Sequence, residues 1–226
     1  MTPTAATTGA VAPADDTTTG SRRCWHAELA WTGPPPGALA GQVLIEVDGD
    51  RIASVSHGAA PPPGAVHLAG LTLPGLTNAH SHAFHRALRG RTQGGAASFW
   101  AWRERMYEVA TRLTPDTYFD LARATYAEMA LAGVTLVGEF HYLHHGPGGR
   151  PYDDPNAMGR ALLAAAGEAG VRLTLLDTCY LLGGFDRPLD GPQLRFGDGD
   201  AGGWAARVSA VAGDLAGGPP AGEVLG

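Results

Sequence analysis

Two short apolar runs separated by a turn-forming sequence are the first strong pattern in the chain. Residues 43–47 and 52–55 are rich in β-branched side chains, and the sequence DGDR at 48–51 stands between them. An Asp-Gly pair favours the positive φ angles of a tight turn between antiparallel strands. The segment 42–55 therefore predicts a β-hairpin.

Strand-like runs at 24–31 and 66–68 lie on either side of this hairpin. Together with it they predict a small β-subdomain over 23–73. Residues 1–22 are rich in Thr, Ala, Pro and Asp, and they lack the basic and apolar regions of a secretion signal. We expect them to form a disordered tail before the folded part.

From residue 74 onward, short apolar runs alternate with amphipathic helical patterns, which is typical of βα units around a parallel sheet. Strands are expected at 76–79, 134–140 and 171–177, helices at 115–133, 155–170 and 204–215, and a further strand at 223–226. A complete (β/α)8 barrel takes about 250 residues, so the segment 74–226 suffices for only three to four units. The pattern predicts either a small open α/β sheet or the front half of a barrel.

Most of the histidines fall in two clusters, each at the carboxyl end of a predicted strand. The clusters are His80, His82 and His85, and then His141, His144 and His145. In parallel α/β folds the loops after the strands hold the active site. Residues i and i+2 of a strand share a face, so His80 and His82 can direct two imidazoles at one metal ion. The alternative is a pair of solvated loop histidines, since a bare His-x-His is a weak signal.

The sequence around this pair resembles a known family. Residues 73–82, LPGLTNAHSH, follow a β-subdomain and resemble the first barrel strand of the amidohydrolase superfamily. Three further segments, AFHRA at 83–87, SFWAWRERMY at 98–107 and GEFHYLHH at 138–145, resemble the formimidoylglutamate deiminase family within it. The resemblance implies a β-subdomain followed by the first half of a metal-dependent-hydrolase (β/α)8 barrel, truncated near strand four.

The same resemblance implies an activity and a set of residues. Members of this family are cytoplasmic enzymes of histidine degradation that hydrolyse N-formimino-L-glutamate to N-formyl-L-glutamate and ammonia. By resemblance His80 and His82 are ligands of one zinc ion, and Arg103, Tyr142 and His85 bind the substrate. The other metal ligands and the acid/base residues belong to later barrel strands, so no catalytic residue is assigned here. We therefore interpret the chain as an N-terminal fragment, and we expect this fragment alone to be inactive and poorly folded. The complete enzyme could be a homodimer.

Two of these substrate residues also have simpler interpretations. Arg103 suits bidentate carboxylate binding, which lysine does not reproduce, but it could instead stack on Trp100 or Trp102 or pair with Glu104 on a surface helix. The hydroxyl of Tyr142 could donate to a substrate carboxylate, or the side chain could be a core tyrosine. The family resemblance favours the binding roles.

The second histidine cluster has no assigned role. His144 and His145 are adjacent and diverge in an extended chain, whereas a structural zinc site needs four converging ligands. We therefore expect a wet, polar loop over the active site at 141–145 rather than a separate metal site. Glu139 would need a cationic or hydrogen-bonding partner if it points into a barrel, and its role stays open.

Composition narrows the function classes. The net charge is −6 and the sequence has no basic stripe, which disfavours nucleic acid and anionic membranes as partners and favours a small molecule. No apolar window reaches the ~18 residues of a membrane span. Cys24 and Cys179 are far apart, which indicates no disulfide scaffold and fits a reducing cytoplasm. Two alternatives remain open: a deaminase of a guanine- or cytosine-like ring, and a truncated product without catalytic activity.

Overall fold

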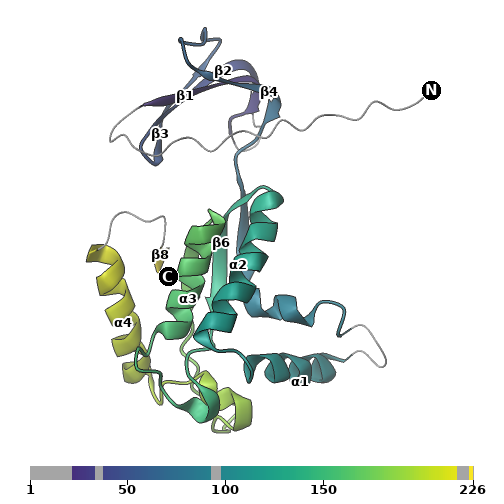
Figure 1. The fold of residues 1–226 in the computed structure, drawn as a ribbon, viewed down its shortest axis with the longest axis vertical. Helices are drawn as coiled ribbons and strands as arrows, with labels where there is room; N and C mark the ends of the chain where they lie inside the picture. The colour runs from purple at the N-terminus through teal and green to yellow at the C-terminus, as the bar shows by residue number, and fades with distance from the viewer. Residues whose placement is uncertain (1–21, 34–37, 93–97, 218–223, 226) are drawn as a thin grey trace, which may run out of the picture. The chain divides into compact units, whose positions relative to one another are not determined.

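The chain divides into two compact units, Met1–Pro74 and Gly75–Gly226. The computed structural model describes residues 22–33, 38–92, 98–217 and 224–225 (Figure 1). The disordered tail expected at 1–22 lies outside the described residues except for Arg22.

The first unit is a four-stranded sheet with strand order β3-β2-β1-β4. Its strands are β1 (Arg23–Trp31), β2 (Leu39–Asp48), β3 (Arg51–His57) and β4 (Val66–Thr72). Strands β1, β2 and β3 pair antiparallel, and β4 pairs parallel with β1. The predicted hairpin is confirmed as β2 and β3, with Gly49 at φ 58° in the turn. The strand expected at 66–68 is longer than predicted.

The second unit is built on an open parallel sheet with strand order β5-β6-β7-β8. The strands are β5 (Leu76–Ser81), β6 (Val134–His141), β7 (Arg172–Asp177) and β8 (Val224–Leu225). The α-helices are α1 (Phe99–Ala110), α2 (Pro115–Leu131), α3 (Ala157–Ala169) and α4 (Ala201–Gly217), and the short 3-10 helices are η1 (Ala83–Leu88), η2 (Pro147–Gly149) and η3 (Gly191–Arg195). Sequential parallel strands joined by helices are the arrangement at the start of a (β/α)8 barrel.

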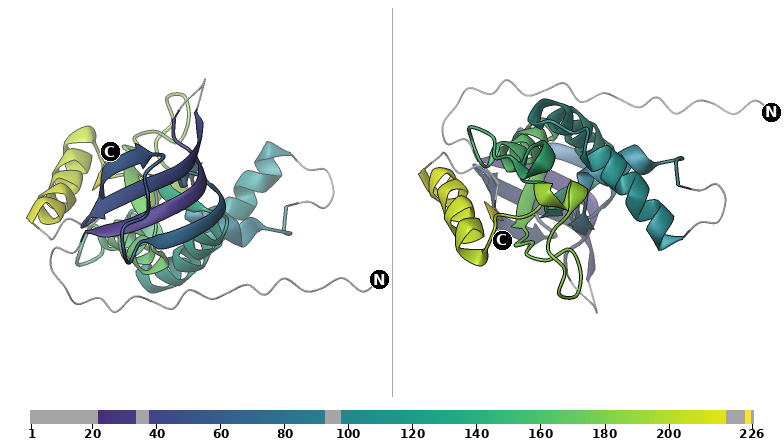
Figure 2. Two further views of the ribbon diagram at one scale, coloured as in Figure 1. Left: turned by 90° about the horizontal axis from the view of Figure 1, so that it is seen from above. Right: turned by 90° about the horizontal axis from the view of Figure 1, so that it is seen from below.

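Helices α2 and α3 pack against each other beside this sheet (Figures 1 and 2). Between helices and strands lies the main core, which includes Tyr118 and Tyr126 of α2, Met158 and Leu162 of α3, and Val137, Leu173 and Leu175 of the strands. The two faces of β6 differ. Phe140 contacts the rings of His80 and His82, while His141 lies against Gly159 of α3. The face of β6 that carries Phe140 therefore carries the candidate metal site.

The predicted start of α2 is confirmed in atomic detail. The Thr114 hydroxyl accepts a hydrogen bond from the Thr117 amide, and the Thr117 hydroxyl accepts one from the Thr114 amide. Pro115 occupies the first helical position, where its missing N–H has no consequence. After the helix, Gly133 adopts φ 85° and turns the chain into β6.

The predicted start of α3 is wrong by two residues. The helix begins at Ala157 rather than at 155 because the carboxylate of Asp154 closes a turn before it. This carboxylate accepts from the amide of Asn156 and from Nε of Arg160, both at 2.9 Å. The predicted end is confirmed, since Gly170 adopts φ 72°.

Helix α1 was not expected from the apolar pattern. Its amino-terminal residues Phe99 and Trp100 are exposed, and only Met106 and Ala110 of the helix are buried. A helix with so narrow a buried face gives no clear period of 3.6 residues in the sequence. Its start is nevertheless defined by Ser98, whose hydroxyl accepts from the Ala101 amide at 3.1 Å.

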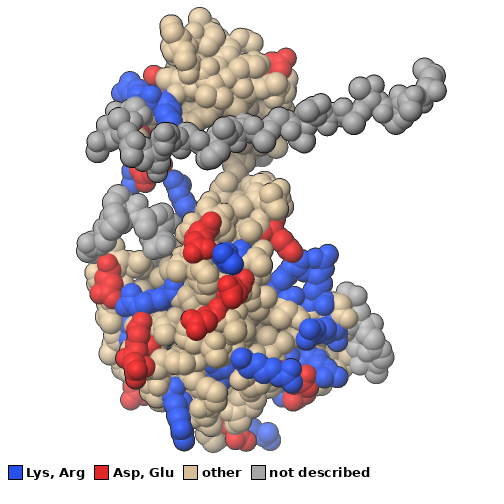
Figure 3. All heavy atoms as spheres, viewed as in Figure 1, with Lys and Arg blue, Asp and Glu red and all other residues tan. Residues whose placement is uncertain are grey.

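The surface of the second unit is mixed in charge. Basic and acidic side chains are interspersed over the face that Figure 3 presents. Among the described helices, none has both the length and the apolar character of a membrane span.

Candidate metal and substrate site

The imidazoles of His80 and His82 converge at the carboxyl end of β5. Their Nε2 atoms lie 2.9 Å apart. The Nδ1–H of His82 donates to the carbonyl of Phe140 at 3.0 Å, which leaves the Nε2 lone pair of His82 directed at His80. Two tetrahedral zinc ligands at ~2.0–2.1 Å from the ion would lie about 3.3 Å apart, so a small outward shift accommodates the ion. The predicted convergence is confirmed, and the donor atoms fit a zinc ion.

His85 and Tyr142 extend this site. The His85 Nε2 lies 2.9 Å from the Tyr142 hydroxyl, and that hydroxyl donates to the sulfur of Met106 at 3.8 Å. The imidazole of His85 also lies against His82, with 4.4 Å between ring centroids. Burial, with smaller contributions from His82 and His80, lowers the pKa of His85 to about 3, so its ring is neutral near pH 7. Burial likewise raises the pKa of Tyr142.

Arg103 lies on α1 in the wall of a cavity. Its guanidinium carbon lies 4.5 Å from the centroid of the Trp100 ring and 5.6 Å from that of Tyr107, and the nearest oxygen of Glu104 is 4.0 Å away. Both simpler interpretations, stacking and a weak ion pair, therefore hold in this structure. The cavity has a volume of about 1020 Å³ and is completed by the segment 183–193. The Arg103 guanidinium is thus stacked and still open to a ligand.

Tyr180 is near both Tyr142 and Arg103. Its ring centroid is 6.4 Å from that of Tyr142, and the charge of Arg103 acts on its hydroxyl. Burial is the largest influence on Tyr180 and raises its pKa. No pattern in the sequence pointed to Tyr180, because its place depends on how the loop after β7 packs.

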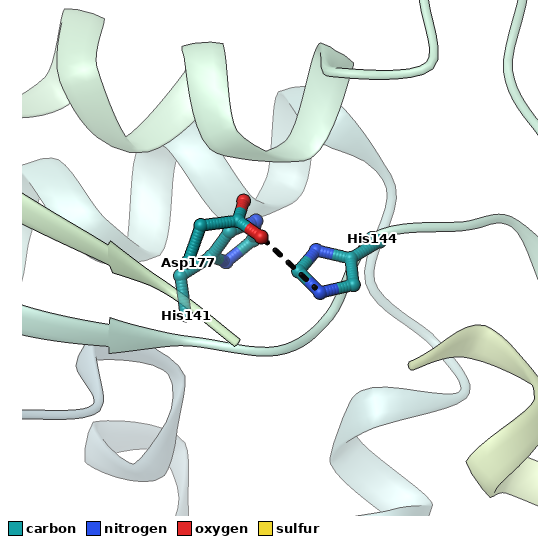
Figure 4. A group of neighbouring side chains, drawn as sticks. All are labelled: His141, His144 and Asp177. Carbon is teal, nitrogen blue, oxygen red and sulfur yellow. Dashed lines mark ion pairs between the residues drawn. The ribbon is translucent and has the colours of Figure 1, made fainter. Parts of the chain in front are cut away.

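The second histidine cluster is buried, so the expectation of a wet loop is wrong. His141, His144 and His145 are 1%, 1% and 5% exposed. One ligand atom each of His141, His144 and Asp177 lie within 4.8 Å of one another (Figure 4). The Nε2–H of His144 donates to the Thr178 carbonyl at 3.0 Å and lies 3.7 Å from Asp177 Oδ1.

The charges around this cluster do not favour a cation. Arg207 donates to both carboxylate oxygens of Asp177, at 2.7 and 2.9 Å, and Trp204 Nε1 donates to Oδ1 at 3.0 Å. Arg207 also binds Asp198, which accepts from His145 Nε2 at 2.9 Å. Burial is the largest single influence and alone would raise the pKa of Asp177, but the hydrogen bonds from Arg207 together with the charges of His144, His141 and Arg207 outweigh it and lower the pKa. A divalent cation here would be repelled by the adjacent guanidinium, so we interpret the group as a structural polar network.

Glu139 faces the helices and not the pair of His80 and His82. Its Oε1 accepts from the Ala83 amide at 2.6 Å, which fixes the residue that follows His82. The side chain is 0% exposed, and burial raises its pKa to about 7 although the Ala83 bond opposes the shift. The Tyr126 hydroxyl is near enough to act on the carboxylate but forms no well-aligned hydrogen bond with it.

Comparison with known proteins places the chain in a family. Residues 71–196 match the Amidohydrolase family, which is more than half of the chain. The chain is 40% identical over 168 residues to a formimidoylglutamate deiminase of Pseudomonas aeruginosa, covering 73% of this chain and 37% of that protein. It is 31% identical over 132 residues to 5-methylthioadenosine/S-adenosylhomocysteine deaminase 2 of Archaeoglobus fulgidus, covering 58% of this chain and 28% of that protein.

Solved structures agree with this result. An amidohydrolase from Brucella melitensis is 36% identical with a TM-score of 0.81, covering 90% of this chain and 45% of that one. The atrazine chlorohydrolase TrzN from Arthrobacter aurescens TC1, complexed with zinc, is 20% identical with a TM-score of 0.68, covering 89% and 45%, and it supports the fold alone. The chain therefore spans less than half the length of these relatives. On the family match and on its open sheet of parallel βα units, this chain belongs to the amidohydrolase family.

Proposed function

We propose that this chain supplies part of the active site of a zinc-dependent formimidoylglutamate deiminase, which hydrolyses N-formimino-L-glutamate to N-formyl-L-glutamate and ammonia. The observation that carries the proposal is the convergence of the His80 and His82 Nε2 atoms, 2.9 Å apart, next to the bonded pair of His85 and Tyr142. The 40% identity to a deiminase of that name supports the choice of substrate.

His80 and His82 would hold the zinc ion through their Nε2 atoms. When bound, the ion supplies Lewis-acid activation of water for hydrolysis. The hydrogen bond from His82 Nδ1 to the Phe140 carbonyl keeps the ring in the tautomer that a metal requires. Catalytic zinc normally has three protein ligands, so the proposal requires at least one ligand beyond these two histidines.

The substrate carries two carboxylates, which need cationic or hydroxyl donors. Arg103 offers a planar fork for one carboxylate, and its stacking on Trp100 limits the orientations of that fork. Tyr142 is 8% exposed, as its core interpretation expects, and its hydroxyl would have to leave the sulfur of Met106 to donate to a substrate carboxylate. A guanine- or cytosine-like substrate would instead be stacked and hydrogen-bonded along its ring edge, and it carries no carboxylates for Arg103 and Tyr142 to bind.

Several wider features belong to the same proposal. The division into a β-subdomain at 23–73 and a barrel part at 74–226, a homodimeric assembly, a cytoplasmic location and a role in histidine degradation follow from the deiminase assignment. The role in histidine degradation stands or falls with the reaction, whereas the division into two parts is supported by the two compact units of the structure.

The test is turnover by a full-length protein that carries this sequence. We expect zinc-dependent release of ammonia from N-formimino-L-glutamate, loss of activity with a chelator and recovery when zinc is restored. His80→Ala and His82→Ala are expected to lower zinc affinity and activity by about 100-fold or more, because each removes a metal ligand. His57→Ala, an exposed histidine of the first unit, is the matched control and should leave both unchanged. Turnover that is insensitive to chelation, or a preference for guanine or cytosine, would contradict the proposal.

A further inference from the structure

Arg195 is a charged residue buried in the core without a carboxylate among its hydrogen-bond partners in the described residues. It is 1% exposed. Its Nε donates to the His145 carbonyl at 2.7 Å, and its Nη2 donates to the Leu113 carbonyl at 2.8 Å and the Tyr152 hydroxyl at 3.3 Å. Its Nη1 donates to the carbonyl of Ala110. The guanidinium thus binds neutral oxygens from several segments.

The main chain of Arg195 joins the same structure. Its carbonyl accepts from the amides of His144 at 3.0 Å and His145 at 2.9 Å. Three connections that follow strands of the parallel sheet therefore meet at this residue. They are the end of α1 after β5, the segment 142–146 after β6, and η3 after β7.

Two of these connections carry the residues proposed to bind the substrate. Arg103 lies on α1 seven residues before Ala110, which is about two helical turns. Tyr142 lies three residues before His145, whose carbonyl and amide are both bound by Arg195. Phe196 adds packing, with its ring centroid 5.1 Å from that of Tyr142 and 6.1 Å from that of Tyr107 on α1.

A guanidinium is suited to this task for a geometric reason. Helix ends leave carbonyls without intrahelical partners, and a cation near the carboxyl end of a helix satisfies them favourably. Arginine presents five donors in a rigid fork, whereas lysine is a point donor on a flexible stem. Only the fork can bind Ala110, Leu113 and His145 at the same time.

We propose that Arg195 is a positioning residue for recognition of the substrate carboxylates, because it holds α1 with Arg103 in register with the segment that carries Tyr142. This inference rests on the proposed function. The inference adds to the proposed function a residue that contacts neither the metal nor the substrate. This residue sets the spacing between Arg103 and Tyr142, which are proposed to bind the substrate.

The test uses Arg195→Lys in the full-length protein, with Arg207→Lys as the matched control. Arg207 is also buried, at 7% exposure, but its partners are Asp177, Asp198 and Asn156, and none of them is on α1. We expect Arg195→Lys to raise KM for N-formimino-L-glutamate by about 10-fold or more while kcat and zinc content change less than about 3-fold. Arg207→Lys should lower thermal stability and leave KM within about 2-fold.

Hydrogen exchange gives a second readout that does not depend on activity. In Arg195→Lys the segments 104–113 and 142–146 should lose protection together, because both are tied to one guanidinium. In Arg207→Lys the loss should fall on β7 and α4 and, through Asp198 and His145, on 142–146, but it should spare 104–113. If wild-type protein does not turn over N-formimino-L-glutamate, the proposed function fails, and the exchange pattern still decides whether Arg195 couples the two segments.

The outcomes that overturn the inference are specific. An unchanged KM in folded Arg195→Lys, an equal rise in KM in Arg207→Lys, or loss of protection in only one of the two segments would each refute it. Where Arg195→Lys does not fold, Arg195→Gln, which keeps a planar donor, is measured in the same way. If both variants are unfolded under conditions in which Arg207→Lys is folded, Arg195 is a general core residue and the positioning role is wrong.

Discussion

Glu139→Gln should stabilise the protein at alkaline pH. The carboxyl is fully buried, and burial raises its pKa to about 7 from an ordinary value of 4.5. The native state therefore holds the proton more tightly than the unfolded state, and the unfolded state releases it first as pH rises. The contribution of the Glu139 carboxyl to the free energy of unfolding is fully present below pH 4.5 and is lost as pH rises through 7.

The size of the effect follows from the shift. A pKa difference of about 2.5 between the folded and unfolded states corresponds to roughly 3 kcal/mol of unfolding free energy. The wild-type protein loses this full amount above pH 7 and only about 1 kcal/mol at pH 5. Glutamine is nearly isosteric and keeps an oxygen that can accept from the Ala83 amide, so the hydrogen bond at Oε1 survives. We expect Glu139→Gln to exceed wild type by up to about 3 kcal/mol at pH 8.

Urea denaturation followed by circular dichroism at pH 5, 6, 7 and 8, with zinc held constant, measures this difference. Glu108→Gln is the control, since Glu108 is half exposed and, among the residues that the structure describes, forms its ion pair with Arg105 on the surface of α1. Its effect should stay within about 0.5 kcal/mol and vary little with pH. If Glu139→Gln is less stable than wild type at pH 8, the bond to Ala83 outweighs desolvation and the reasoning is refuted.

Three further predictions concern Arg103, Gly138 and Gly213. Arg103→Lys in the full-length protein should lower kcat/KM for N-formimino-L-glutamate by about 10-fold or more, mainly through KM, because lysine lacks the planar fork. Steady-state kinetics measure this loss, and the control variant Arg105→Lys should not show it. Gly138→Ala should destabilise by more than about 1 kcal/mol, since a Cβ would lie 2.9 Å from the Ala79 carbonyl oxygen on β5. Gly213→Ala, with open space around its Cβ in α4, should stabilise by about 0.5–1 kcal/mol. Equal urea midpoints for these two glycine variants would contradict the packing argument.

Local sequence determined the features that depend on neighbouring residues. Three local signals each fix backbone angles within a few residues, so the elements beside them could be predicted. They are the Asp-Gly turn at 48–49, the helix-capping hydrogen bonds between Thr114 and Thr117, and Gly170 at the end of α3. The convergence of His80 and His82 belongs to the same class, because alternate residues of an extended chain share a face whatever surrounds them. The alternation of strands and helices and the convergence of the two histidines therefore followed from local sequence, whereas the choice of a half barrel over a small open sheet came from the family resemblance.

Tertiary structure decided the features that depend on partners far along the chain. Arg195 meets the carbonyls of Ala110 and Leu113, more than 80 residues away, and Arg207 meets Asp177 thirty residues away. The sequence shows these residues as ordinary charges, since nothing nearby reveals that packing will bury them. His141 to His145 was predicted as a wet loop for the same reason: polarity predicts exposure on average, but burial is set by the helices and loops that close over a strand end. Side-chain chemistry and spacing along the chain are local properties, whereas desolvation and the pairing of buried charges arise only when distant segments pack together.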